Sequence, residues 1–372
     1  MRVGLVVYGS LDTVSGGYLY DRELVAHLRR QKDDVEVFSL PWRSYGCHLT
    51  DNVSNTLFWR LAVARLDVLL QDELNHPSLF WLNRRLRAVV SYPIVSVVHH
   101  LRSDEARPFW QNRLYRRIER QYLASVDGFV TNSEATRTAV AALVGSDKPV
   151  VVARPAGDRW RISLSEVEIR ARANEPGPLR LVFLGNIIPR KGLHTLLAAL
   201  ARTPAGTVTL DVIGSPAVDP AYSARMQALA RELHLEAGVA FRGLLADAQV
   251  AEHLTRGHVL IVPSSHEGFG IVYLEGMGFG LPAIATTAGG ASEIVHHGEN
   301  GFLVAPGDAE VLATCLTRLH TDRALLATMA VAAQQTYDHQ PTWEETGGKI
   351  RSFLEDWPRT AATAGSHLSV MG

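Results

Sequence analysis

The chain has 372 residues and a formal net charge of −1, with 47% apolar and 20% charged residues. This length exceeds what one hydrophobic core usually fills, so we expect two domains. The composition is that of a globular protein and excludes a disordered chain. No apolar stretch approaches the roughly 20 residues that a membrane-spanning helix needs.

Charge and cysteine content narrow the expected partners and location. Residues 1–155 carry 20 Lys and Arg against 16 Asp and Glu, a net charge of +4, and the remainder carries 17 against 22, a net charge of −5. This bias is too weak to indicate nucleic acid, and it leaves an anionic acceptor or lipid surface open. Cys47 and Cys315 form neither a disulfide framework nor a metal-spaced pair. We expect a cytoplasmic protein that binds no nucleic acid, with peripheral contact at the inner face of the membrane left open.

Short runs of Val, Ile and Leu alternate with longer segments of helical period along the chain. This pattern is typical of parallel strands that crossover helices cover on both faces. The predicted strands are 3–8, 35–40, 66–70, 94–98, 128–131 and 150–152 in the first half, and 179–184, 208–213, 239–241, 259–263, 283–286 and 302–304 in the second. Each half is predicted to be a complete doubly wound α/β domain.

The hinge between the two domains is predicted at residues 154–178, from the Pro- and Gly-containing segment 154–158 to the breaker cluster at 173–178. We assign residues 1–155 to an N-terminal domain and 156–341 to a C-terminal domain. A last helix begins near Thr342 and carries Trp343 and two further aromatic residues, more than a free tail would expose. The segment from about 342 to 372 is therefore expected to join the first domain.

A glycine-containing loop follows the first predicted strand. Residues 12–17 read Asp-Thr-Val-Ser-Gly-Gly and precede a helix expected from about Tyr18. Gly16 and Gly17 lie between the predicted strand and the predicted helix. The loop lacks the Gly-x-Gly-x-x-Gly pattern of dinucleotide-binding proteins, which disfavours an oxidoreductase. A simple turn at a helix start is the alternative interpretation.

His99 stands at the carboxyl end of predicted strand 94–98. Ligands of open parallel sheets bind at such strand ends, so His99 is a candidate site residue. The chain has fifteen histidines, and a structural or surface role is the alternative.

A basic and aromatic stretch follows between Arg102 and Arg120. It holds six arginines in nineteen residues, with Phe109, Trp110 and Tyr115 interleaved. Such a segment can lie on an anionic membrane or bind an anionic acceptor. A solvated helix face with core aromatic residues is the alternative.

Two motifs in the second half of the chain place charged side chains just after predicted strands. Residues 183–192, Phe-Leu-Gly-Asn-Ile-Ile-Pro-Arg-Lys-Gly, place Lys191 and Arg190 after a strand, where cations can reach phosphates. Residues 259–275 end a strand, pass through a loop with Gly268 and Gly270, and begin a helix near Ile271. The exposed N–H groups of a new helix suit a diphosphate.

Glu267 and Glu275, with seven residues between them, resemble the Glu-x7-Glu motif of retaining glycosyltransferase family 4. The likeness extends to Val-Pro-Ser-Ser at 262–265, Gly-Leu-Pro-Ala-Ile-Ala at 280–285 and Gly-Gly at 289–290. It implies the GT-B fold, an α/β architecture of two Rossmann-like doubly wound domains facing across a cleft. The N-terminal domain would be on the acceptor side, and the C-terminal domain would bind the nucleotide sugar.

The resemblance also implies roles for individual residues. The implied catalytic residues are His99, Glu267 and Lys191, and the implied donor-binding residues are Gly16, Gly17, Arg190, Lys191, Gly268, Phe269, Gly270, Ile271 and Glu275. Asn186 departs from the family's Gly-Arg-Leu-x3-Lys-Gly pattern, and Arg190 would supply the missing positive charge. No two aspartates lie two positions apart, so a metal-binding Asp-x-Asp motif is missing and neither a metal nor another cofactor is expected.

The resemblance implies transfer of a hexose from a nucleotide-diphosphate sugar to an acceptor hydroxyl with retention of configuration. The acceptor, whether a sugar, a lipid-linked molecule or another small molecule, stays open, as do the donor base and the oligomeric state. Two alternatives remain: a sugar-nucleotide epimerase of the same fold, and a nucleotide-sugar-binding protein without catalysis, which only Asn186 suggests.

Overall fold

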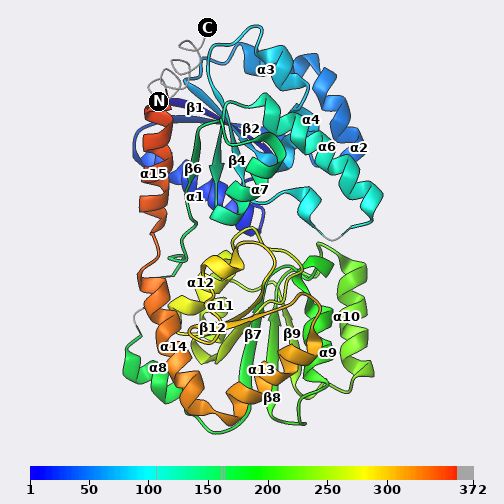
Figure 1. The fold of residues 1–372 in the computed structure, drawn as a ribbon, viewed down its shortest axis with the longest axis vertical. Coiled ribbons are helices and arrows are strands. Elements are labelled where there is room, and N and C mark those ends of the chain that lie inside the picture. Colours follow the sequence, from blue (N-terminus) through cyan, green and yellow to red (C-terminus); the bar gives the residue numbers. More distant parts are fainter. Residues whose placement is uncertain (106, 161, 163, 358–372) are drawn as a thin grey trace. The chain divides into compact units, whose positions relative to one another are not determined.

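The computed structural model of the chain describes residues 1–105, 107–160, 162 and 164–357. It divides into two compact units (Figure 1). Unit 1 comprises Met1–Pro155 together with the segment that begins at Pro341, and unit 2 comprises Ala156–Gln340. The end of the segment predicted to join the first domain, residues 358–372, lies outside the described residues.

Unit 1 is built on a parallel sheet of six strands in the order β2-β1-β3-β4-β5-β6. The strands are β1 Arg2–Tyr8, β2 Asp34–Leu40, β3 Val68–Asp72, β4 Ile94–Val98, β5 Gly128–Thr131 and β6 Val150–Val152. The helices are α1 Gly16–Arg30, α2 Tyr45–Leu49, α3 Asn55–Ala62, α4 His76–Leu79, α5 Leu82–Leu86, α6 Phe109–Ser125, α7 Glu134–Val144 and α15 Trp343–Glu355, with 3-10 turns η1 Thr50–Val53, η2 Glu73–Asn75 and η3 Arg102–Asp104. The strand order reverses direction between β1 and β3, which is the switch point where such sheets bind ligands.

Unit 2 has a second parallel sheet of six strands, in the order β12-β11-β10-β7-β8-β9. The strands are β7 Leu179–Leu184, β8 Val208–Ile213, β9 Val239–Gly243, β10 Val259–Ile261, β11 Ala283–Thr286 and β12 Gly301–Val304. The helices are α8 Glu166–Ala173, α9 Leu193–Leu200, α10 Pro220–Glu232, α11 Asp247–Arg256, α12 Ile271–Gly278, α13 Ala309–Thr321 and α14 Arg323–Asp338, with 3-10 turns η4 Pro189–Lys191 and η5 Gly290–Glu293. Its switch point lies between β7 and β10.

All twelve predicted strands are present, and the largest shift concerns β3. The prediction of 66–70 ended at the last apolar residue, whereas the strand continues through Gln71 to Asp72. Gln71 is buried, and it exchanges two side-chain hydrogen bonds with Asn83, at 2.8 and 3.0 Å. A buried polar residue with its partners satisfied can occupy a central strand.

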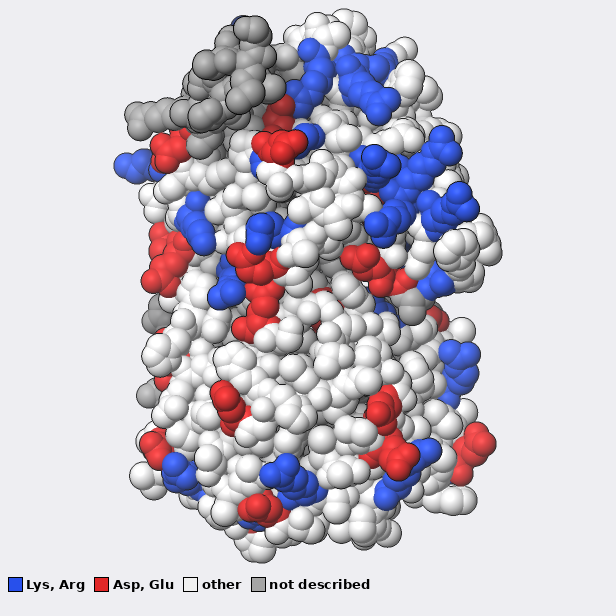
Figure 2. Space-filling model, in the orientation of Figure 1, with Lys and Arg blue, Asp and Glu red and all other residues white. Residues whose placement is uncertain are grey.

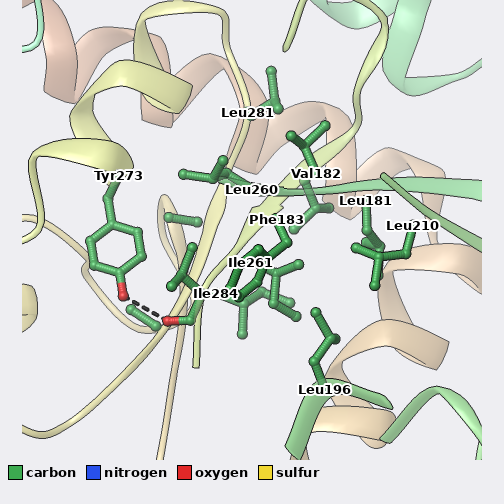
Figure 3. Packing of buried hydrophobic residues seen from close by; sticks show 14 of the residues in the cluster. Leu181, Val182, Phe183, Leu196, Leu210, Leu260, Ile261, Tyr273, Leu281 and Ile284 are labelled. Carbon is green, nitrogen blue, oxygen red and sulfur yellow. Dashed lines mark hydrogen bonds between the residues drawn. The ribbon is translucent and has the colours of Figure 1, made fainter. Parts of the chain in front are cut away.

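The core of unit 2 fixes the start of α12 (Figure 3). Phe183 of β7, Ile261 of β10 and Ile284 of β11 pack together, and the buried Tyr273 of α12 joins them. The Tyr273 hydroxyl donates to the Val262 carbonyl at 2.7 Å. This bond ties the first turn of α12 to the end of β10.

The last described helix packs against the first helix within unit 1. The Trp343 ring lies edge-on to Tyr20 at 5.7 Å, and a Cβ at Gly347 would come within 2.4 Å of the His27 side chain. None of the helices in the described part of the chain combines the length and apolar character that a bilayer crossing needs.

Candidate functional site

The predicted phosphate-binding lysine and the first glutamate of the motif meet at the switch point of unit 2. Lys191 follows β7 and Glu267 follows β10, which is the neighbouring strand. Gly192 permits this approach, because a Cβ there would lie 2.0 Å from the Pro263 carbonyl oxygen. The Lys191 ammonium donates a short hydrogen bond to Glu267 Oε1.

Glu267 is nearly buried and held by several donors. Ser264 Oγ donates to Glu267 Oε1 at 2.7 Å, and the Arg190 guanidinium lies 3.5 Å from Oε2. Arg190 also donates to the His266 carbonyl at 2.8 Å, which fixes its side chain beside the pair. Burial would raise the pKa of Glu267, but Lys191, Arg190 and the Ser264 hydrogen bond lower it to about 2. The site therefore holds one carboxylate between two cations.

A pair of glycines supports the Glu267 loop from behind. The Gly290 N–H donates to the Glu267 carbonyl at 2.8 Å, and a parallel bridge joins Glu267 to Gly289. A Cβ at Gly289 would lie 1.9 Å from the Glu267 oxygen, and one at Gly290 would lie 2.2 Å from the Gly268 oxygen. Only residues without side chains permit this contact between two loop backbones.

The loop enters α12 through Gly270, which has a φ of +96°. The N-cap has no side-chain hydrogen bond, so the first N–H groups of α12 are not capped by a side chain. Of the predicted donor-binding residues here, Phe269 is only 2% exposed and its side chain belongs to the core. Its side chain is therefore structural, and only its backbone is a candidate for ligand contact.

Glu275 lies on α12 with a different set of partners. It is buried, and its Oε1 lies 3.5 Å from Arg159 without a hydrogen bond to any described residue. Burial raises the pKa of Glu275, and Arg159 partly opposes this shift. Gly157 passes close to this turn, since a Cβ there would lie 3.2 Å from the Glu275 nitrogen.

Arg159 is a site residue that sequence reasoning missed. Its Nε donates to Asp247 Oδ2 at 3.1 Å, and its guanidinium lies over the Trp160 ring, 4.6 Å from the centroid. Asp247 begins α11, in the stretch after β9. Nothing in the sequence marks an arginine after the domain boundary as a neighbour of Glu275.

In unit 1, the glycine loop and His99 come together. Ser15 caps α1, which begins at Gly16 rather than at the expected Tyr18. A Cβ at Gly17 would lie 3.1 Å from His99 Cδ2, so the missing side chain lets the imidazole lie against the helix start. The Asn132 side chain donates to the His99 carbonyl at 2.8 Å and fixes the backbone there.

Two buried carboxylates accompany His99, and sequence reasoning identified neither. His99 Nε2 donates to Asp21 Oδ1 at 3.1 Å, and Asp72 at the end of β3 offers a carboxylate oxygen within 4.8 Å of both groups. Among the described residues, Glu73, His76 and Glu119 form a second buried group of this kind. We assign no metal to either group.

Only part of the basic stretch faces solvent. Phe109 and Trp110 are 80% and 67% exposed, whereas Tyr115 is buried. The guanidinium of Arg102 lies over the Tyr115 ring, and Arg107 pairs with Glu105. The expectation of a solvated helix face with core aromatic residues therefore holds for Tyr115, because the helical period turns that position toward the core, and not for Phe109 and Trp110.

The sequence of unit 2 matches a described family. Residues 165–336 match the model of glycosyl transferases group 1. The matched residues all lie within unit 2. This agrees with the resemblance drawn from Lys191, Glu267 and Glu275.

Curated relatives carry related names. A D-inositol 3-phosphate glycosyltransferase of Rhodococcus erythropolis is 31% identical over 245 residues, which is 63% of this chain and 55% of the relative. A GDP-mannose-dependent alpha-(1-6)-phosphatidylinositol monomannoside mannosyltransferase of Mycobacterium tuberculosis is 29% identical over 208 residues, 53% of each chain. The chain thus spans about half the length of the curated relatives it matches.

Solved structures match the whole described architecture. Sucrose-phosphate synthase from Thermosynechococcus elongatus has a TM-score of 0.82 at 20% identity, covering 97% of this chain and 100% of that one. HepE from Anabaena, in complex with UDP and glucose, has a TM-score of 0.75 at 22% identity, covering 96% and 100%. The predicted GT-B fold is confirmed.

Proposed function

We propose that the protein is a retaining glycosyltransferase that moves a hexose from a nucleotide-diphosphate sugar to an acceptor hydroxyl. The observation that carries this proposal is the Lys191 and Glu267 pair at the switch point of the unit that matches the model of glycosyl transferases group 1. At that position the lysine can contact the phosphates of a donor, and the carboxylate can accept hydrogen bonds from the hydroxyls of its sugar.

Each residue of unit 2 has a proposed part in this reaction. Lys191, Arg190 and the N–H groups at the start of α12 would stabilise the negative charge of the departing diphosphate. Glu267 would accept hydrogen bonds from sugar hydroxyls, and Glu275 from ribose hydroxyls. The anomeric carbon would lose its bond to the phosphate oxygen and gain one to the acceptor oxygen, and the departing phosphate would take the acceptor proton. His99 of unit 1 stays a predicted contact of the donor sugar.

The donor must replace an existing partner of Lys191. Without phosphate, the lysine donates to Glu267. With a diphosphate bound, the ammonium would turn to the phosphate oxygens, and Glu267 would be released toward the sugar. Binding and arrangement of the catalytic carboxylate would thus be one event.

Thermal-shift measurements with UDP, GDP, ADP and their sugars test the donor class. A ligand at 100 times its dissociation constant should stabilise the native state by about 2.7 kcal/mol. The stabilising nucleotide sugar is then incubated with candidate acceptors, and the anomeric configuration of the product is read by NMR. Stabilisation by no nucleotide would contradict the proposal, and donor cleavage that needs no acceptor would favour an epimerase or hydrolase.

We further propose that no metal ion takes part. Lys191, Arg190 and helix N–H groups supply the positive charge that a divalent ion would otherwise provide near phosphates. Transfer should continue after treatment with EDTA and desalting. Activity that disappears and returns with magnesium or manganese would overturn this part of the proposal.

We also propose a cytoplasmic enzyme that binds the inner membrane surface through unit 1. Helix α5 packs against both α3 and α6, and blue side chains gather over this region in Figure 2. The exposed residues of these helices and their caps include Trp59, Arg60, Trp81, Arg84, Phe109, Trp110, Arg113, Leu114, Arg116, Arg117 and Arg120. The sole acid of the three helices, Glu119, is buried. A basic surface with exposed aromatic rings suits anionic lipid.

Sedimentation with anionic vesicles tests the membrane proposal. Each basic residue near the surface contributes about 1 kcal/mol, so binding should be strong at low salt and fade as salt rises. Replacing Arg113, Arg116 and Arg117 by Ser should release the protein. Replacing Arg202, Arg231 and Arg256 of unit 2 by Ser removes the same charge elsewhere and should not. Absence of binding at low salt would leave a soluble acceptor as the better proposal.

A further inference from the structure

The His99 imidazole is fixed on several sides within unit 1. Its Nε2 donates to Asp21 Oδ1 at 3.1 Å, and the start of α1 lies against the ring at Gly17. The Tyr20 ring meets it edge-on at a centroid distance of 5.2 Å. The orientation of the ring is therefore set by protein contacts that exist without any ligand.

In this geometry, the protonation state of the ring determines whether Nδ1 accepts or donates a hydrogen bond. Because Nε2–H is directed at a carboxylate, a neutral ring would offer only a lone pair at Nδ1. A second proton would turn Nδ1 into a hydrogen-bond donor. Nδ1 makes no hydrogen bond to any residue that the structure describes, so it is the nitrogen left for a ligand.

The acidic groups around His99 favour the second proton. They are Asp21 on α1, and Asp72 and Glu73 at the end of β3; Tyr20 is the other titratable neighbour. Burial would lower the pKa of His99, but these three acids raise it to about 9. Burial and Asp21 raise the pKa of Asp72 to about 8. Asp21 accepts the hydrogen bond from His99 and is fully buried, so it is the carboxyl group placed directly against the ring.

We propose that Asp21 is a positioning residue of glycosyl transfer, which keeps His99 doubly protonated and makes Nδ1 a hydrogen-bond donor to an oxygen of the bound donor. The part concerning transfer rests on the proposed function. The part concerning the imidazolium rests only on the geometry of unit 1. No motif in the sequence indicates Asp21, because α1 brings it to His99 across 78 positions of the chain.

NMR of the full chain with 15N-labelled histidine tests the charge directly, and comparison with His99→Gln identifies the His99 ring signals. At pH 7.5 both ring nitrogens of His99 should be protonated. In Asp21→Asn the ring should be neutral at the same pH. Glu23→Gln removes a carboxylate two positions along α1 and should leave the ring charged. A neutral ring in the unaltered protein overturns the proposal whether or not transfer is detected, and so does a ring signal that EDTA changes, because a bound cation would then replace the proton.

Kinetics test the consequence for the reaction. Asp21→Asn should lower kcat at least about 10-fold, change the donor KM little, and move the alkaline limb of the pH profile down by about one unit or more. Asp21→Glu, which keeps the carboxylate, should recover part of kcat. A folded Asp21→Asn protein with a neutral ring but unchanged kcat and pH profile would show that Asp21 is merely structural.

Discussion

The two carboxylates of the Glu-x7-Glu motif lie in different electrostatic environments, which shift their pKa values in opposite directions. Glu267 faces Lys191 and Arg190, and its pKa falls to about 2. Glu275 is buried with Arg159 at 3.5 Å, and its pKa is raised. Glu267 is therefore already paired with cations, while Glu275 has an oxygen whose hydrogen-bonding capacity is unused within the described residues. An unused buried acceptor is a good partner for ligand hydroxyls.

Replacing Glu275 by Ala should weaken nucleoside-diphosphate binding about 10-fold or more, because ribose hydroxyls lose a charged acceptor. Isothermal titration calorimetry measures the change. Glu252→Ala, at an exposed position of α11, is the matched control and should bind normally. Equal affinity of Glu275→Ala and the unaltered protein would contradict a role at the ribose.

The sequence allowed prediction of those site residues that follow strands within short motifs. Lys191, Glu267 and Glu275 are of this kind, since strand ends and spacing are readable from the chain. Asp21 and Arg159 are not, because a carboxylate on a helix reaches His99, and an arginine after a domain boundary reaches Glu275, only through tertiary packing within each unit. The direction of the Phe269 side chain could not be predicted either, because glycines flank this loop residue on both sides and no helical or strand periodicity applies to it.

At the scale of elements, the loop that carries Glu267 is shaped by a second loop behind it. Glycines 289 and 290 place backbone against backbone, with Gly290 donating to the Glu267 carbonyl. The position of the Glu267 carboxylate thus depends on the absence of side chains at positions 289 and 290. This explains in physical terms why the Gly-Gly pair accompanies the motif.

Gly290→Ala should destabilise unit 2 by about 2 kcal/mol or more and weaken nucleotide binding, because its Cβ would lie 2.2 Å from the Gly268 oxygen. Gly348→Ala is the control, since that position in α15 has no atom within 4 Å of a new Cβ. Calorimetric unfolding and nucleotide titration measure the two effects. Unchanged stability and nucleotide affinity in Gly290→Ala would mean that the two loops can move apart without loss of stability.

Helix α6 meets η2 and α4 through the buried titratable side chains of Glu119, Glu73 and His76. Glu119 is fully buried, and burial together with Glu73 raises its pKa to about 7. Such a group stabilises the fold fully below its unfolded pKa of about 4.5, and this stabilisation is lost as pH rises through 7.

Glu119→Gln should therefore gain stability relative to the unaltered protein as pH rises from 5 to 8, by up to about 3 kcal/mol, because the amide mimics the protonated acid and cannot ionise. Differential scanning calorimetry at several pH values measures the difference for unit 1. Parallel stability curves for the two proteins would show that Glu119 does not titrate in this range.

At the scale of the whole molecule, the number of strands and their approximate positions were predictable because buried parallel strands are continuous apolar runs. The extension of β3 to Asp72 was not, since Gln71 looks like a loop residue until its partner Asn83 is known. Each sheet forms the core of its own unit, so the two units should respond separately to local damage.

Trp343→Ala should lower the unfolding temperature of unit 1 alone, by an amount equivalent to about 3 kcal/mol, because a tryptophan only 7% exposed leaves a cavity beside Tyr20. Scanning calorimetry should show an unchanged transition for unit 2, and nucleotide affinity should persist. Trp59→Ala, at a position 60% exposed, serves as the control. A common fall of both transitions would contradict independent units.

The return of α15 to unit 1 has a consequence for biosynthesis. The ribosome delivers β1 to β6 first, but the helix that covers α1 and the Trp357 ring that occupies the space beside Gly128 emerge only after all of unit 2. Unit 2 is continuous in sequence and can close its core as soon as it leaves the exit tunnel. The half of the protein that is translated first is thus the half that is completed last, and during that interval its exposed α1 surface is where nascent-chain chaperones would be expected to bind.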